Sequence, residues 1–152
     1  MHNNHVSVLI PTFGIELLVL RVQNNKLLGD LPVNICNLHG LFELSLSGNK
    51  IPGSIPTSIT LLRNLESLYN NNNRVLGALP PWSIEMISSL VVLDLSNNDL
   101  TCKIPADFNN HSIVSLNFSF NQLNGEVTLS LQSENYNHNF LRNYGLCGKW
   151  VR

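Results

Sequence analysis

The sequence predicts a repeat solenoid of α/β type, mostly β-strand with short helical or 3-10 segments. The first observation behind this is periodicity. Residues 90–105 surround an asparagine with regularly spaced apolar residues, and the arrangement recurs at steps of 24, 24, 25 and 23 residues. The asparagine of each copy is Asn25, Asn49, Asn73, Asn98 and Asn121. The second observation is how completely the copies match: with eight defined positions in each of five copies, only Asn70, Cys102 and Thr128 depart from the pattern. Self-similarity at such a period is the sequence mark of a solenoid.

The repeated pattern is L-x-x-L-x-L-x-x-N-x-L followed by G-x-[IL]-P, which is the signature of a leucine-rich repeat. Alternating apolar and polar residues, as in Leu93-Asp94-Leu95, predict a short strand with one buried face. The asparagine can bond backbone groups with its carbonyl and its amide, which suits a buried turn. The glycine permits a turn with positive φ, and the proline fixes φ on the far side of the coil. We therefore expect about five coils of 23–25 residues.

The chain divides into three segments. Residues 1–16 form an irregular N-terminal remnant, in which Ile10-Pro11 resembles the end of a preceding repeat. Residues 17–131 form the solenoid, and residues 132–152 form a C-terminal closing segment. The early apolar stretch is broken by Pro11 and Gly14 and has no basic region before it, so we expect neither a signal peptide nor a transmembrane helix in this chain.

Composition narrows the classes of function. Charged residues make up 12 % of the chain and the formal net charge is −1, which gives no basic patch for nucleic acid.

Cys36 and Cys102 lie more than two coils apart, beyond the reach of a disulfide, and Cys147 lies about two coils beyond Cys102. We expect Cys36 and Cys102 to be free thiols. The same objection to a disulfide holds less firmly for Cys147, because its tail is irregular.

The glycine and Ile-Pro positions resemble the plant-specific subclass of leucine-rich repeats found in receptor-like kinases, receptor-like proteins and secreted polygalacturonase inhibitors. The closing residues 134–148, ENYNHNFLRNYGLCG, are similar to the segment that ends receptor-like kinase ectodomains. Together with Ser130-Leu131-Gln132 they most resemble the HAESA-like group, whose members perceive small peptides with a co-receptor. This resemblance implies an extracellular or plasma-membrane-surface location and a role in signalling or defence, as a glycoprotein.

Departures from that family favour a fragment. The cysteine-paired N-terminal cap, a second cysteine after Cys147, the transmembrane helix and the Ser/Thr kinase domain of the family have no counterpart in the sequence. We expect a non-catalytic module for protein or peptide interaction, derived from a receptor-like kinase ectodomain. Two alternatives stay open: a secreted inhibitor of the polygalacturonase-inhibitor type, and a truncated product without activity of its own.

The expected ligand face consists of the strand residues that point away from the core. Tyr69 is its one aromatic, and we expect Tyr69, Arg21 and Asp94 to be the anchors, because aromatic and arginine side chains dominate interfaces. A solvated strand face without a ligand is the plainer interpretation. The candidate contact residues are Arg21, Gln23, Glu43, Ser45, Ser47, Tyr69, Asn71, Asp94, Ser96, Asn117 and Ser119.

Other sites are few. Two glycosylation sequons begin at Asn110 and Asn117. The five histidines are scattered over different coil positions, and no serine, histidine and acid fall together as a triad, so we expect no catalytic residues, no metal site and no cofactor.

Two weak points follow from the repeat pattern. Without a capping repeat, Leu17, Leu20, Val22, Leu27 and Leu31 lack a neighbouring coil, which predicts self-association through the N-terminal end. Asn70 occupies a core position, and a buried amide without partners costs about 1 to 3 kcal/mol. We expect Asn70→Leu to raise the melting temperature.

Overall fold

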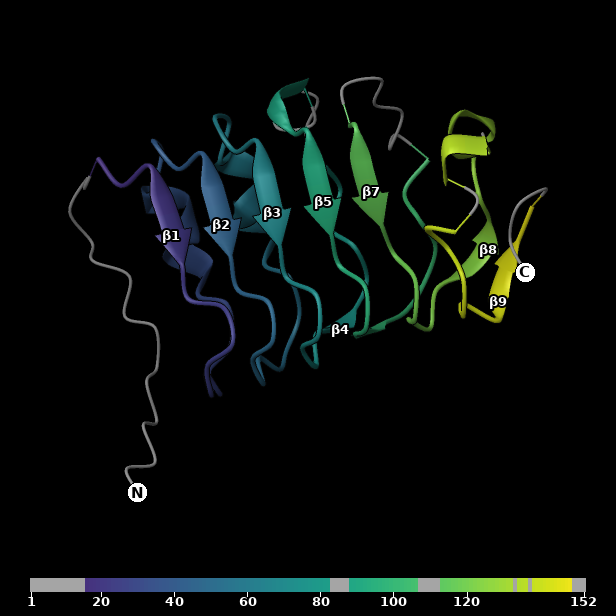
Figure 1. The fold of residues 1–152 in the computed structure, drawn as a ribbon, viewed down its shortest axis with the longest axis horizontal. Helices are drawn as coiled ribbons and strands as arrows, with labels where there is room; N and C mark the ends of the chain where they lie inside the picture. Colours follow the sequence, from purple (N-terminus) through teal and green to yellow (C-terminus); the bar gives the residue numbers. More distant parts are fainter. Residues whose placement is uncertain (1–15, 83–87, 107–112, 133, 137, 149–152) are drawn as a thin grey trace.

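A computed structural model describes residues 16–82, 88–106, 113–132, 134–136 and 138–148. The chain winds into stacked coils, with the N-terminal coil at one end of the row and the C-terminal coil at the other (Figure 1). The strands are β1 Val19–Arg21, β2 Glu43–Ser45, β3 Ser67–Tyr69, β4 Leu76–Gly77, β5 Val92–Asp94, β6 Asp99–Leu100, β7 Ser115–Asn117, β8 Asn124–Glu126 and β9 Gly145–Cys147. The 3-10 helices are η1 Val33–Asn37, η2 Thr57–Leu61, η3 Leu129–Leu131 and η4 Glu134–Tyr136. The predicted fold, mostly strand with short helical segments, is confirmed.

One parallel sheet carries the repeats. Its strand order is β1-β2-β3-β5-β7, and two further parallel sheets of two strands each, β4-β6 and β8-β9, lie outside it. Each strand supplies one inward leucine, and the five leucines stand in register because every coil repeats the same spacing. This ladder consists of Leu20, Leu44, Leu68, Leu93 and Leu116. From Leu44 onward its members are at most 2 % exposed, so the middle of the row forms a dry core.

The repeat asparagines bond backbone groups with both their amides and their carbonyls, as their chemistry predicts. Asn98 donates its side-chain amide to the carbonyls of Asn70 and Leu95 at 2.8 and 3.1 Å, and its Oδ1 accepts the backbone N–H of Val75 at 3.0 Å. Asn49, Asn73 and Asn121 bond in the same way to their own coil and to the preceding one. Each asparagine therefore ties two coils together through backbone groups that have no strand partner.

The closing segment forms a further, shortened coil. Asn143 donates to the carbonyls of Phe118 and Phe140 at 2.9 and 3.0 Å, and its Oδ1 accepts the backbone N–H of Leu123 at 3.0 Å. The Phe118 and Phe140 rings pack with their centroids 6.1 Å apart, and both are buried. The spacing of Phe140 and Asn143 is that of the third apolar position and the asparagine in the repeat, so residues 138–148 extend the stack beyond the fifth coil.

All three cysteines are free, as predicted for Cys36 and Cys102. Cys102 takes the glycine position of its coil with φ +67°, where Gly53 and Gly77 have φ +68° and +82°. Within the described ranges no helix is long and apolar enough to cross a membrane.

Candidate functional site: the exposed face of the five-stranded sheet

The register of the sheet aligns the predicted ligand residues into columns. The central column runs through Arg21, Ser45, Tyr69, Asp94 and Asn117, each the Cα partner of the next. A neighbouring column begins at Val19 and Glu43. A third column, which follows each strand, contains Gln23, Ser47, Asn71, Ser96 and Ser119. The structure thus brings these side chains onto one face, which Figure 1 shows as the row of arrows.

Three of these residues offer little surface. Ser45, Ser96 and Ser119 are 8 %, 3 % and 7 % exposed. The hydroxyls of Ser96 and Ser119 also donate hydrogen bonds within their own coils, to Oδ1 of Asp94 and of Asn117. They are therefore placed on the face but are poor direct contacts for a ligand. Arg21 and Gln23 are exposed, and Glu43, Ser47, Tyr69, Asn71, Asp94 and Asn117 are half-buried.

At one end of the face, Arg21 and Glu43 form a two-pronged ion pair. The Nε and Nη2 atoms of Arg21 donate to the two carboxylate oxygens of Glu43 at 2.7 and 2.6 Å. These hydrogen bonds lower the pKa of Glu43 and raise the pKa of Arg21, with the charge of the partner acting in the same direction for each. The guanidinium of Arg21 is thus already occupied by a carboxylate of the same chain, which competes with any acidic ligand.

The middle of the face has a different character. Tyr69 and Asp94 are Cα partners on adjacent strands β3 and β5. Oδ1 of Asp94 accepts the backbone N–H and the hydroxyl of Ser96 at 3.0 and 2.7 Å, which fixes the carboxylate on the strand. The Ser47 hydroxyl is hydrogen-bonded to Oδ1 of Asn71 on the next coil. An oriented carboxylate beside an aromatic ring suits hydrogen-bonding or cationic groups of a peptide.

The two predicted glycosylation sites differ in what the structure describes. Asn110 lies outside the described residues. Asn117 ends β7 on the exposed face, and its Oδ1 accepts the backbone N–H and hydroxyl of Ser119 at 3.1 and 2.7 Å. Within the described ranges no group of three or more histidine, cysteine or acidic side chains is placed to hold a metal ion.

Comparison with known proteins decides the family. The family model described as Leucine Rich Repeat matches residues 16–38, 40–62 and 89–111. The chain is similar to the BIR2 ectodomain from Arabidopsis thaliana, with 30 % identity and a TM-score of 0.78 over 85 % of this chain and 68 % of that one. This chain belongs to the leucine-rich repeat family. The predicted resemblance to plant receptor-kinase ectodomains is confirmed.

Two further ectodomains from Arabidopsis share the fold. The SOBIR1 receptor-kinase ectodomain is 28 % identical with a TM-score of 0.73, over 84 % of this chain and 70 % of that one. The HAESA receptor kinase, in a complex with the peptide hormone IDA and the co-receptor SERK1, is 28 % identical with a TM-score of 0.66, over 86 % of this chain. This leucine-rich repeat chain spans only 26 % of HAESA. No curated protein sequence matches it significantly. Its fold is that of these ectodomains, which are non-catalytic binding modules.

Sequence reasoning missed two features of this face. The pairing of Arg21 with Glu43 could have been expected, because residues at neighbouring column positions of adjacent strands are in contact. The continuation of the stack by Phe140 and Asn143 had a signal in their spacing. That signal is short, because the copy lacks most of the other repeat positions.

Proposed function

We propose that this chain is a protein- or peptide-binding module from the extracellular part of a plant receptor kinase, and that it binds through the exposed face of the five-stranded sheet. The observation that carries the proposal is the alignment of polar side chains on that face, with Tyr69 and Asp94 paired at its centre. The similarity to HAESA, which was crystallised with a peptide hormone and a co-receptor, supports the same kind of partner here. The location would be the cell surface or the extracellular space.

The face sets the size of the ligand. Five strands about 4.8 Å apart span roughly 19 Å. An extended peptide covers that distance with about six residues at roughly 3.3 Å each. A longer peptide overhangs the sheet, so we expect this chain to bind a short segment by itself, with any further contact supplied by a second protein.

The chemistry of the face sets the kind of ligand. Arg21 is engaged by Glu43, so the free charge at the centre is the carboxylate of Asp94. Tyr69 adds an aromatic surface beside it. We therefore expect the preferred peptide to present a basic or hydrogen-bond-donating side chain to Asp94 and an apolar side chain to Tyr69.

A displayed library of random peptides, selected on the purified chain, tests this proposal. Enriched peptides are then measured on Tyr69→Ala, on Asp94→Asn and on Arg74→Ala, a control that removes an exposed arginine outside the three columns. We expect both face variants to weaken binding about tenfold or more, which is about 1.4 kcal/mol. The control should bind as wild type. Equal affinities for the wild type and both face variants would exclude this face as the binding surface.

We also propose self-association through the first coil. Leu18 and Val33 are 61 % and 75 % exposed there, although Leu27 and Leu31 are buried within the coil. Exposed apolar side chains favour association with another molecule. Size-exclusion chromatography of the chain and of Leu18→Asp should show dimers or larger species for the first and a smaller species for the second. A clean monomer for the wild type at micromolar concentration would contradict this.

A further inference from the structure

The residue before each coil asparagine has a left-handed backbone in all six coils. The six residues and their φ angles are Asn24 +56°, Gly48 +67°, Asn72 +55°, Asn97 +54°, Phe120 +56° and Arg142 +60°. Glycine adopts this conformation without a steric penalty, and asparagine adopts it more readily than other side chains. The first four coils therefore use residues suited to the position, whereas the last two use bulky side chains that are not.

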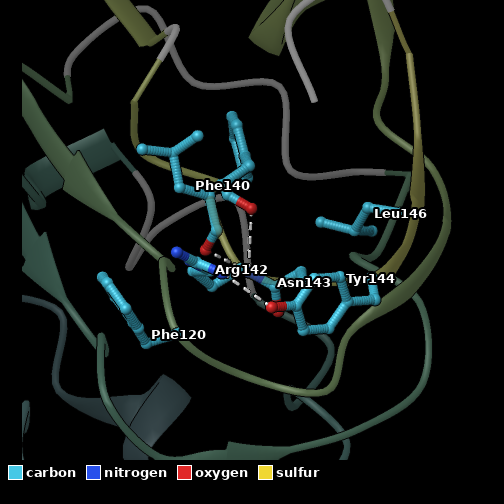
Figure 2. A pocket seen from close by; sticks show the side chains of 7 residues that line it. Phe120, Phe140, Arg142, Asn143, Tyr144 and Leu146 are labelled. Carbon is cyan, nitrogen blue, oxygen red and sulfur yellow. Dashed lines mark hydrogen bonds between the residues drawn. The ribbon is translucent and has the colours of Figure 1, made fainter. Parts of the chain in front are cut away.

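These two unfavourable positions are neighbours in the stack. The backbone N–H of Phe120 donates to the carbonyl of Leu141 at 2.8 Å, next to Arg142. Phe120 and Arg142 line a hollow of about 650 Å³, together with Phe140, Tyr144 and Leu146 (Figure 2). Phe140 and Leu146 are buried, while Phe120 and Tyr144 are 50 % and 87 % exposed. The hollow thus has a buried apolar wall and an exposed aromatic rim.

The hollow also holds an available positive charge. Nη1 of Arg142 donates to the Tyr144 hydroxyl at 2.9 Å, as Figure 2 shows, so the guanidinium is oriented by a neutral group. Among the described residues, the ion pair of Arg21 with Glu43 is the only one, and Arg142 faces no carboxylate. A guanidinium has five N–H donors, and those left over can grip a carboxylate with two parallel hydrogen bonds.

The backbone beside the hollow continues the hydrogen-bond ladder that joins the coils. In the fifth coil, the N–H groups of Phe118 and Phe120 donate to Asn139 and Leu141 at 2.7 and 2.8 Å. The equivalent N–H groups one coil further belong to Phe140, which is buried, and to Arg142, which is exposed, and no described residue accepts from the N–H of Arg142. An exposed backbone N–H on the same residue as a guanidinium lets one acidic segment accept from both groups.

We propose that this hollow is a docking site for an extended acidic segment of a partner protein. A carbonyl of the segment accepts from the N–H group of Arg142, and one of its carboxylates binds the Arg142 guanidinium. An apolar side chain of the segment packs against Phe120 and Tyr144. This contact explains why Phe120 and Arg142 keep an unfavourable left-handed backbone: their side chains are needed at the rim of the hollow. The site is separate from the sheet face that carries Tyr69 and Asp94.

A defined probe tests the proposal on the full chain. A blocked peptide with alternating apolar and acidic residues, acetyl-Ile-Glu-Phe-Glu-Ile-Thr-amide, is titrated into isotope-labelled protein and followed by NMR. We expect amide shifts at Phe120 and at residues 140–146. The version with both glutamates changed to glutamine should bind at least about tenfold more weakly.

Variants separate binding from folding. Phe120→Asn and Arg142→Asn place a favoured residue at the left-handed position, so they should fold with unchanged or higher melting temperature while losing about tenfold in peptide affinity. Arg74→Asn, which removes an exposed arginine from an earlier coil, should bind as wild type, and so should Tyr69→Ala on the sheet face. The proposal is overturned by a lack of shifts, by equal binding of the glutamine peptide, or by full binding of both variants. Loss of binding in Tyr69→Ala would also overturn it, by moving the contact to the sheet face.

Discussion

Asn70→Leu is the substitution whose effect the structure allows to be worked out most fully. Asn70 stands where the other coils have Val22, Leu46, Leu95 and Phe118, and it is 1 % exposed. Its Oδ1 accepts from Asn73 at 2.9 Å, but its Nδ2 has no partner among the described residues. A buried donor left unpaired costs about 1 to 3 kcal/mol.

The replacement exchanges that cost for apolar burial. A leucine of similar volume gains about 1.5 to 3 kcal/mol from burial, and the hydrogen bond given up by Asn73 is worth about 1 kcal/mol. Asn73 keeps its bond to the Leu46 carbonyl at 3.0 Å. Its bond to the backbone carbonyl of residue 70, now 3.5 Å, can shorten to the 3.1 Å of the equivalent pair Asn98 and Leu95. We expect a net stabilisation of about 2 kcal/mol, which raises the melting temperature by roughly 4 to 8 °C for a chain of this size.

Circular dichroism during heating and during urea titration measures both quantities. Asn98→Leu is the matched control, because the Asn98 amide is bonded to three carbonyls and its Oδ1 to a buried N–H. It should be destabilised by more than about 2 kcal/mol. A melting temperature lowered in Asn70→Leu would refute the reasoning, since it would show that the Asn70 amide is satisfied in solution.

Three further predictions rest on single observations. Cys102→Gly should raise stability by up to about 1 kcal/mol in urea titration, because glycine has no steric penalty at φ +67°, whereas Cys36→Gly, within η1, should lower it. The carboxyl of Glu43 should titrate below the usual glutamate range by NMR, and Arg21→Gln should return it to that range. The pKa of Glu43 is lowered in the folded state. The ion pair's small contribution to stability is therefore present above the ordinary glutamate pKa and is lost as the pH falls through the lowered pKa. If acid changed the stability of the wild type and of Arg21→Gln by the same amount, this prediction would be contradicted. Expression in plant cells followed by enzymatic deglycosylation should shift the wild type on a gel more than Asn117→Gln, and equal shifts would show that Asn117 carries no glycan.

The sequence by itself determined the repeat architecture. Each coil position requires one property, such as an apolar side chain, an asparagine or a positive φ, and a residue meets that requirement without long-range contacts. The repeat pattern therefore predicts the roles of Leu93, Asn98 and Gly77 from the sequence alone. The alignment of the face into columns also follows, since equal spacing in successive coils places equivalent residues side by side.

Only the tertiary structure decided which neighbours satisfy one another. Arg21 binds Glu43, a partner on the next coil, and Asn70 is half satisfied by Asn73. Burial of Ser96 likewise depends on the side chains around it rather than on its own repeat position. The Arg21–Glu43 pair depends on a contact between coils, 22 residues apart in the chain, and the Asn70–Asn73 bond depends on rotamers within one coil. The spacing of a repeat encodes neither. The hollow at Arg142 belongs to the same class, because its walls come from two successive coils that meet only when the solenoid is stacked.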